Sequence, residues 1–210
     1  MTEGASVAVI DDDPQIRNSL KVLLSTASIA TETFESAEDF LSSPACGNVG
    51  CLLLDVRLPG MTGMDLLKAL PTGRRGCPVI VITGHGDVPL AVRAMRMGAF
   101  HFVQKPFDPE TLLAICLEAL ERAERGADER QRIQKLESMY ESLTERERQV
   151  LELLVDGLPS KLIAHELGIS TRTAEHHRSA VMKKMKARST SHLVRMALDM
   201  QRGDSRNVGP

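Results

Sequence analysis

The chain has 210 residues and a formal net charge of −2, and 42% of its residues are hydrophobic although only 3% are aromatic. No apolar stretch approaches the ~18 residues of a membrane-spanning helix, and the first residues lack the basic and apolar segments of a secretory signal. The length fits two modest domains, and four cysteines without CxxC or metal-ligand spacing indicate reduced thiols in a cytoplasmic protein with no membrane partner. A redox pair of Cys46 and Cys51 is the lesser alternative.

Residues 1–122 alternate short apolar runs with helical stretches. The apolar runs cover residues 7–10, 51–54, 79–82 and 102–104. The helical stretches cover residues 14–27, 36–42, 64–70, 89–97 and 109–123. Short apolar runs between helices favour parallel strands that are buried on both faces. We therefore predict an α/β first domain, a doubly wound five-stranded parallel sheet with five helices.

A polar side chain follows each of the four apolar runs. Asp11-Asp12-Asp13 follow the first run, Asp55 the second, Thr83 the third and Lys105 the fourth. In a parallel sheet, ligand-binding groups collect beyond the carboxyl ends of the strands. Several carboxylates at one edge are costly to gather without a bound ion, and such a cluster favours a hard divalent cation, most plausibly Mg2+. The sequence thus predicts a phosphorylatable pocket at this edge.

These positions resemble the receiver domain of two-component response regulators, which has a flavodoxin-like fold. The resemblance is carried, in chain order, by Asp11-Asp12, Asp55 with Leu58-Pro59-Gly60, Thr83-Gly84 and Lys105-Pro106. Residues 83–92 are similar to the FixJ branch in particular. The resemblance implies that Asp55 is the nucleophile and is phosphorylated by a sensor histidine kinase.

The same resemblance implies a role for each polar group around Asp55. The ligands of Mg2+ would be Asp12 directly, Asp11 through water, Asp55 itself and the backbone carbonyl of Arg57. Lys105, aimed by a cis peptide bond to Pro106, and Thr83 would stabilise the phosphoryl oxygens. After phosphorylation Thr83 would move toward the phosphate, and the ring of Phe102 would fill the space that it leaves.

Residues 123–142 form a highly charged stretch that we predict to be a helical linker. Its apolar residues Ile133, Leu136 and Tyr140, followed by Leu143, are spaced by three or four positions. This spacing is helical and is compatible with a solvated linker helix or with a short seam against a second copy of the chain. The sequence leaves both alternatives open.

From residue 143 onward the pattern is helical only. Thr144 with Glu147 forms a capping box that opens a helix to about residue 156, and further helices are predicted over 159–168, 171–185 and 191–200. Residues 201–210 are polar and are predicted to be a disordered tail. Residues 1–122 carry 10 Lys and Arg against 15 Asp and Glu, whereas residues 158–206 carry 10 against 4. This asymmetry fits an acidic regulatory half and a half that meets polyanions.

Residues 143–200 resemble the LuxR/NarL-type helix-turn-helix domain, through 143–151, Gly157-Leu158, 161–164, 167–170 and 182–184. The second helix of the motif would enter the major groove of double-stranded DNA. Its predicted base-facing row is Arg172, Glu175, His176 and Ser179. The predicted phosphate contacts are Lys161, Thr173, Lys183 and Lys184, and the DNA-contacting set also includes His177 and Arg178. A small helical dimerisation domain is the alternative.

The combination predicts a transcription regulator that is switched by phosphorylation. Phosphorylation of Asp55 would promote formation of a homodimer and sequence-specific DNA binding. The resemblance favours activation of transcription over repression. RNA polymerase is a further candidate partner. No enzymatic activity is expected beyond the chain's own phosphotransfer and dephosphorylation. Two alternatives are a haloacid-dehalogenase-type phosphatase, in which Asp11 would be the nucleophile, and a DNA-binding regulator that does not depend on phosphate.

Overall fold

The computed structural model describes residues 6–70, 77–84 and 88–205. The chain divides into two compact units, Met1–Ala127 and Asp128–Pro210, and each is described by itself. Within the described residues, no helix combines the length and the hydropathy needed to cross a membrane.

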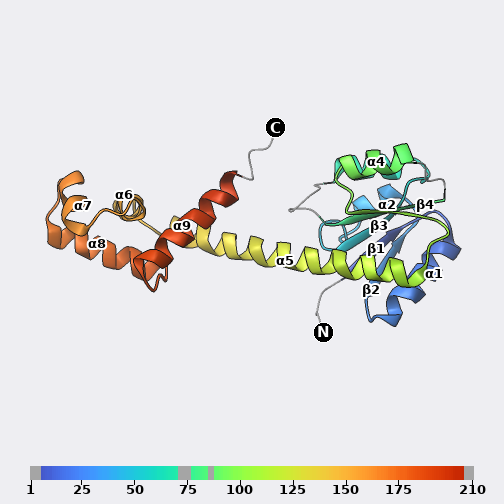
Figure 1. The fold of residues 1–210 in the computed structure, drawn as a ribbon, viewed down its shortest axis with the longest axis horizontal. Helices are drawn as coiled ribbons and strands as arrows, with labels where there is room; N and C mark the ends of the chain where they lie inside the picture. The colour runs from blue at the N-terminus through green and yellow to red at the C-terminus, as the bar shows by residue number, and fades with distance from the viewer. Residues whose placement is uncertain (1–5, 71–76, 85–87, 206–210) are drawn as a thin grey trace. The chain divides into compact units, whose positions relative to one another are not determined.

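The first unit contains a five-stranded parallel sheet (Figure 1). Its strands are β1 (Ser6–Ile10), β2 (Ala30–Phe34), β3 (Cys51–Asp55), β4 (Val79–Thr83) and β5 (His101–Gln104). The order in the sheet is β2-β1-β3-β4-β5. Strands β3 and β4 are buried at every position, whereas the edge strand β2 is not, which explains why only β2 lacks a recognisable apolar run. The predicted α/β sheet is confirmed.

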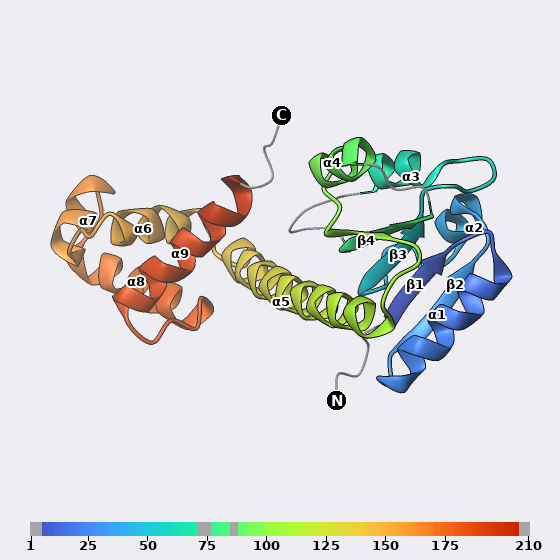
Figure 2. The same ribbon diagram turned by 45° about the vertical axis from the view of Figure 1, so that its right-hand side comes forward.

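Helices cover both faces of this sheet (Figure 2). The helices of the first unit are α1 (Pro14–Thr26), α2 (Ala37–Ser42), α3 (Gly63–Ala69), α4 (Val88–Arg96) and the start of α5 (Pro109–Glu141). One core contains Ile10 and Leu54 of the sheet together with Leu66 of α3, and the helices packed there are α2, α3 and α4. The opposite core joins the alternate strand positions to α1 and α5, including Leu24 and Leu112. Side chains that alternate between two cores are what a doubly wound sheet requires.

The second unit is helical. It contains the end of α5, then α6 (Glu145–Val155), α7 (Ser160–Glu166), α8 (Thr171–Lys184) and α9 (Thr190–Ser205). The predicted capping box is present, because Thr144 accepts from the backbone N–H of Glu147 and the Glu147 carboxylate accepts from the backbone N–H of Thr144. The apolar face of α8 is buried through Val181 and Met185, both fully enclosed.

Two expectations for the second half of the chain are corrected by the structure. The apolar stripe of the linker is not solvated along its length, because Leu136 and Leu143 are buried in the core of the second unit with Tyr140 packed beside them. An apolar stripe shows that a helix is covered without showing by what. Helix α9 continues to Ser205, so residues 201–205 are helical rather than part of a disordered tail; residues 206–210 lie outside the described residues.

Glu147 joins α6 to α8 and gives the second unit a pH-dependent contact. Its carboxylate accepts from the Lys184 ammonium at 2.6 Å and from the Thr144 backbone N–H at 2.7 Å, and only 6% of the residue is exposed. The hydrogen bond from Lys184, and then that from Thr144, lowers the pKa of Glu147 from its ordinary value of 4.5.

We expect Glu147→Gln to destabilise the second unit by about 1–2 kcal/mol at neutral pH, because glutamine keeps the capping acceptor but loses the charge that faces Lys184. A carboxylate with a lowered pKa stabilises the fold above its ordinary pKa, and this contribution is lost as the pH falls through the folded value. Urea unfolding should therefore separate variant and parent at pH 7 and bring them together well below pH 4.5. A gap that persists unchanged in acid would show that charge is not the cause.

Candidate phosphorylation site and nucleic-acid interface

The carboxyl ends of four adjacent strands meet at one edge of the sheet. Ile10 of β1 is in register with Leu54 of β3, Asp55 with Ile82 of β4, and Thr83 with Gln104 of β5. The residues that end or follow these strands therefore lie side by side. They include Asp11, Asp12, Asp55, Thr83 and Lys105, whereas Asp13, which also follows the first apolar run, caps α1 by accepting from the backbone N–H of Gln15.

Lys105 bridges two of the carboxylates. Its ammonium donates to Oδ2 of Asp11 at 2.6 Å and to Oδ2 of Asp55 at 2.8 Å. Both aspartates are buried, and burial raises the pKa of Asp11 despite the opposing hydrogen bond from Lys105. Burial alone would lower the pKa of Lys105, but its hydrogen bonds to Asp11 and Asp55 outweigh it and the pKa is raised. The pocket therefore holds a charged ammonium between two buried acids.

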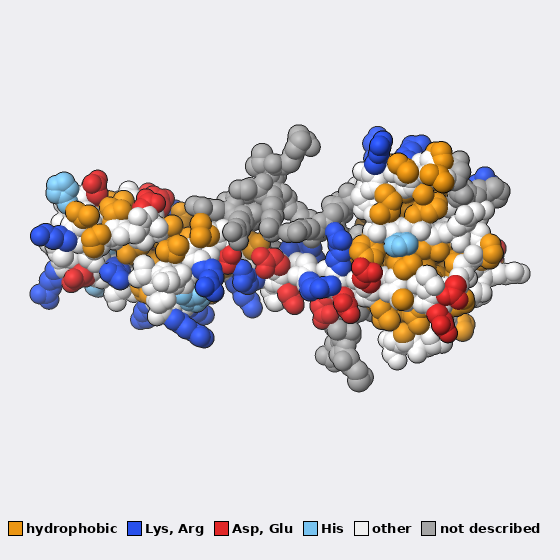
Figure 3. Space-filling view, viewed as in Figure 1, with side chains coloured by type: hydrophobic (Ala, Val, Ile, Leu, Met, Phe, Trp, Pro, Cys, Tyr) orange, Lys and Arg blue, Asp and Glu red, His pale blue; other side chains and the backbone are white. Residues whose placement is uncertain are grey.

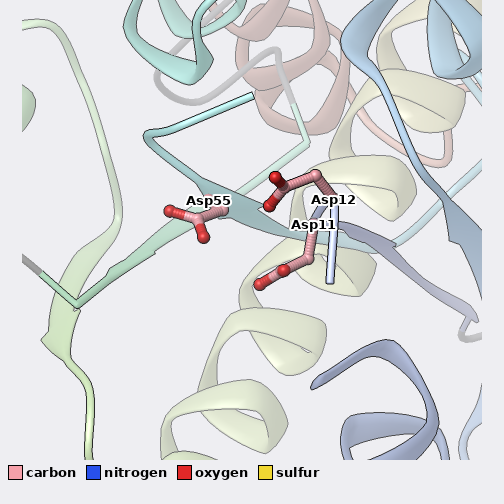
Figure 4. Close-up of side chains that lie close together, drawn as sticks. All are labelled: Asp11, Asp12 and Asp55. Carbon is pink, nitrogen blue, oxygen red and sulfur yellow. The ribbon is translucent and has the colours of Figure 1, made fainter. Parts of the chain in front are cut away.

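Asp11, Asp12 and Asp55 converge at the ends of β1 and β3 (Figure 4). Each offers a carboxylate oxygen, and these three atoms lie within 4.8 Å of one another. Oxygen ligands around octahedral Mg2+ are separated by about 3–4 Å, given metal–oxygen distances of about 2.1 Å. The exposed Asp12 also leaves an open side for water, which this cation tends to keep. The donor set and its spacing therefore fit Mg2+.

The remaining predicted residues of the pocket are also placed at this edge. The Arg57 side chain is exposed, whereas its backbone N–H donates to Oδ1 of Asp55 at 3.2 Å. Thr83 is 1% exposed at the end of β4, and the half-buried Phe102 pairs with Val81 on the neighbouring strand. The Lys105–Pro106 peptide bond is cis, as predicted. Phe102 is thus close in the sheet to the strand that carries Thr83.

Two side chains that hold the pocket were not predicted. Arg17 of α1 donates through Nη1 to the carbonyl oxygens of Asp11 at 2.6 Å and Asp12 at 3.0 Å. Glu38 of α2 accepts from the backbone N–H of Met61, in the loop that follows Asp55. An arginine one turn into the helix after the acidic pair could have been noticed. No sequence signal points to Glu38, because its partner lies 23 residues away.

The start of α3 packs directly on the backbone of the nucleophile candidate. A Cβ on Gly63 would overlap the carbonyl oxygen of Asp55 and would lie 2.9 Å from its carbonyl carbon. The neighbouring atom is backbone and cannot turn away, so only glycine fits. Thr62 caps the same helix by accepting from the backbone N–H of Asp65.

Most of the predicted DNA-contacting residues are exposed on α8 and α7. Ser170 caps α8, and Ala174 on its inner side is buried. The exposed members of the predicted set are Lys161, Arg172, Thr173, Glu175, His176, Ser179 and Lys183. Figure 3 shows Lys and Arg side chains gathered along one edge of the second unit. The helix therefore offers a polar row outward while its other side is packed.

Three members of the set are half-buried. Arg178 donates to the hydroxyls of Ser160 at 3.4 Å and Thr190 at 3.1 Å, and the Lys184 ammonium is paired with Glu147. The His177 ring contacts that of His176, with the centroids 6.1 Å apart. Arg178 and Lys184 thus tie α8 to neighbouring elements, a role that the sequence did not suggest.

All four cysteines are free thiols. Cys51 and Cys116 are buried, and Cys46 and Cys77 are half-buried. Burial raises the pKa of Cys77 and of Cys116 to about 12, and that of Cys51 is also raised well above its ordinary value, chiefly by burial. Thiols in this state are poor nucleophiles.

Two protein families match separate parts of the chain. The response regulator receiver domain matches residues 7–117, and the luxR family of bacterial regulatory proteins matches residues 141–197. Neither match supports a phosphatase of the haloacid dehalogenase type, or a second unit that serves only for dimerisation.

Relatives and solved structures extend the likeness over nearly the whole chain. The transcriptional regulatory protein FixJ of Azorhizobium caulinodans is 48% identical over 199 residues, which cover 94% of each protein. The C4-dicarboxylate transport transcriptional regulatory protein DctR of Rhodobacter capsulatus is 42% identical and covers 91% of this chain and 98% of that protein.

Among solved structures, the response regulator StyR is 40% identical with a TM-score of 0.84, and the alignment covers 93% of this chain and 98% of that one. Full-length FixJ from B. japonicum is 43% identical with a TM-score of 0.55, and covers 95% of this chain and 98% of that one. With both domains matched in order, the chain belongs to the FixJ group of two-component response regulators, transcription regulators that join a receiver domain to a LuxR-type DNA-binding domain.

Proposed function

We propose that the receiver domain accepts a phosphoryl group on Asp55 from a sensor histidine kinase, and that this step controls dimerisation and sequence-specific DNA binding. The observation that carries the proposal is the ammonium of Lys105 held between the buried carboxylates of Asp11 and Asp55, with Asp12 beside them. A site with several acids and one fixed cation is suited to a transferred anion only when further positive charge is added. Bound Mg2+ would supply that charge.

In the proposed transfer, a carboxylate oxygen of Asp55 forms a bond to phosphorus as the phosphorus–nitrogen bond of a phosphohistidine breaks, and the electron pair of that bond leaves with the imidazole nitrogen. Asp11, Asp12 and the Arg57 carbonyl would hold the cation. The Lys105 ammonium, already at hydrogen-bonding distance from Asp55, balances charge on the phosphoryl oxygens. The Arg57 N–H fixes the orientation of the Asp55 carboxylate.

The proposed response to phosphorylation involves β4, which carries Thr83, and β5, which carries Phe102. Thr83 lies beside Asp55 at the end of β4 and donates its hydroxyl to the new phosphoryl group, and Phe102 moves into the space that Thr83 leaves. Helix α4 connects β4 to β5 in the chain, and its apolar side chains Val88, Val92 and Met95 are exposed. An apolar face of this kind supports association with a second copy.

Dimerisation would place two DNA-binding domains on one site. Single helix-turn-helix modules bind weakly, and linking two raises the effective concentration of the second. In this proposal, the exposed row on α8 meets base edges in the major groove and Lys161, Thr173 and Lys183 meet phosphates. RNA polymerase is a further proposed partner of the DNA-bound dimer.

The test combines phosphorylation with DNA affinity. Full-length protein is treated with a small phosphodonor, genomic fragments that it binds are selected, and affinity for one fragment is then measured with and without the donor at fixed salt. We expect phosphorylation to strengthen binding on the order of a hundredfold, and chelation of divalent cations to abolish the gain.

Arg172→Ala is the matched variant for the DNA side, because Arg172 is exposed on α8 and far in sequence from the receiver pocket. It should accept phosphate at the parental rate and bind DNA at least about tenfold more weakly. Equal DNA affinities with and without the phosphodonor would instead favour the phosphate-independent regulator.

A further inference from the structure

A pocket of about 770 Å³ lies within the DNA-binding unit, between the end of α5, α6 and α9. Its floor is apolar and includes Leu151, Val155 and Met200, with the ring of Tyr140 beside them. No lining residue comes from α7 or α8, the helices proposed to meet DNA. The pocket is therefore accessible while α8 lies in a groove.

Four carboxylates surround this floor. They belong to Glu137, Glu141, Glu152 and Asp156, all of them exposed. Within the described part of the chain, none of the four forms an ion pair with a basic side chain. Among the described lining residues the basic one is Arg148, which stacks over the Tyr140 ring at 5.5 Å and is paired with Glu145, outside the pocket.

The position of these acids is unfavourable for the domain itself. Glu137 and Glu141 stand four residues apart at the end of α5, and Glu152 and Asp156 stand four apart at the end of α6. Like charges at this spacing repel each other, and negative charge at a helix C-terminus opposes the helix dipole. Neither helix has a basic residue of its own in its last turn; at the end of α5, Arg148 of α6 donates to the backbone carbonyl of Glu141 at 3.4 Å. Charged residues that destabilise the ends of their own helices, with no stabilising contact in return, are typical of functional sites.

The acidic pocket differs in charge from the helices that follow α6 in the chain. Residues 158–206, which supply Ala197 and Met200 to the lining, carry 10 Lys and Arg against 4 Asp and Glu. An acidic pocket repels DNA and attracts cations.

We propose that this pocket binds a basic amphipathic helix of a partner protein, whose apolar side chains fill the floor while its Lys and Arg side chains meet the four carboxylates. An apolar centre with a charged, solvent-exposed rim is the anatomy of a protein interface. A small organic cation fits less well, because sites for small molecules use buried polar groups to fix orientation and these carboxylates are all exposed. The surface thus gives the regulator a protein contact that is separate from its DNA contact.

The experiment uses the full chain and a labelled synthetic helix of about 18 residues, with Leu on one face and Lys on the other. Binding is followed by fluorescence anisotropy at physiological salt. A peptide of the same composition with scrambled order controls for charge alone. We expect saturable binding of the amphipathic peptide and on the order of tenfold weaker binding of the scrambled one.

The decisive variant is the double substitution Glu141→Gln and Glu152→Gln. It should weaken peptide binding on the order of tenfold and, because it removes repulsion at two helix ends, raise the unfolding midpoint of the DNA-binding unit by about 2–6 °C. The matched control, Glu118→Gln with Glu124→Gln on α5, changes the charge equally outside the pocket and should leave peptide binding unchanged. If the carboxylates served only to stabilise the domain, removing two of them would not raise the unfolding midpoint while weakening peptide binding.

Three outcomes would overturn the proposal. Absence of saturable peptide binding would show that the pocket has no such ligand. Equal loss of binding in the control variant would show attraction to overall charge only. A change in the sedimentation of the unliganded chain caused by the pocket variant would show that a second copy, and not a partner helix, occupies the pocket.

Discussion

Asp55→Asn is expected to reduce phosphoryl uptake from a small phosphodonor to background, the largest functional effect of any single substitution in this chain. The amide is not a nucleophile, and it removes one of the two carboxylates that hold the Lys105 ammonium. The dimerisation and the gain in DNA affinity that follow phosphorylation should be lost with it. Radioactive uptake and borohydride reduction, which converts an aspartyl phosphate to homoserine, measure the effect directly.

Asp39→Asn is the matched control for this substitution. Asp39 lies exposed on α2 and makes no side-chain contact with the pocket, so the same change of charge should leave phosphorylation unaltered. Persistence of a reducible label in the Asp55 variant would mean that another carboxylate is the nucleophile. Asp11 would then be the first to test, because Lys105 binds it at 2.6 Å, slightly closer than it binds Asp55.

Gly63→Ala is expected to destabilise the receiver domain by about 3 kcal/mol, the largest effect on stability that a single added carbon should cause here. The new methyl group would overlap the carbonyl oxygen of Asp55, and relief requires α3 or the end of β3 to move. Because Asp55 is the proposed phosphoryl acceptor, the displaced backbone should also slow phosphorylation. Denaturant unfolding measures the loss of stability. Amide hydrogen exchange of β3 shows whether that loss of stability lies in the receiver domain.

Gly84→Ala serves as the control for stability. Gly84 directly follows β4, and a Cβ there would meet no atom of the described residues within 4 Å. The expected change in unfolding free energy is within about 0.5 kcal/mol. Equal destabilisation by both substitutions would show that the loss of glycine as such, and not the overlap with Asp55, sets the effect.

The receiver fold, and the gathering of Asp55, Thr83 and Lys105 at one edge of its sheet, followed from local patterns in the sequence. Asp55 and Thr83 end the buried strands β3 and β4, Lys105 directly follows β5, and parallel strands bring their carboxyl ends to one edge. The sequence predicted five strands but did not give the position of β2. This edge strand contains exposed residues such as Glu32 and has no apolar run that would mark it in the sequence. The supporting contact of Glu38 with Met61 could not be foreseen, because it joins residues whose proximity exists only in the folded chain.

Fewer features of the second unit could be predicted from the sequence. The capping box at Thr144 and the buried face of α8 follow from spacing alone. The apolar stripe at Leu136 could not be assigned a partner, because periodicity reveals a covered face and not the surface that covers it. Basic side chains present the same difficulty: Arg178 and Lys184 appear suited to phosphate in the sequence, yet in the fold both donate to neighbouring helices.

The ammonium that bridges Asp11 and Asp55 has a consequence for a cell that is short of magnesium. It acts as a built-in counterion, so we expect the acidic edge of the sheet to stay folded when divalent cations are removed. The proposed phosphoryl transfer would have no such substitute, because the incoming group brings more negative charge than one ammonium can balance. Starvation for divalent cations should therefore silence the signal while leaving the protein intact and ready to respond once the ion returns.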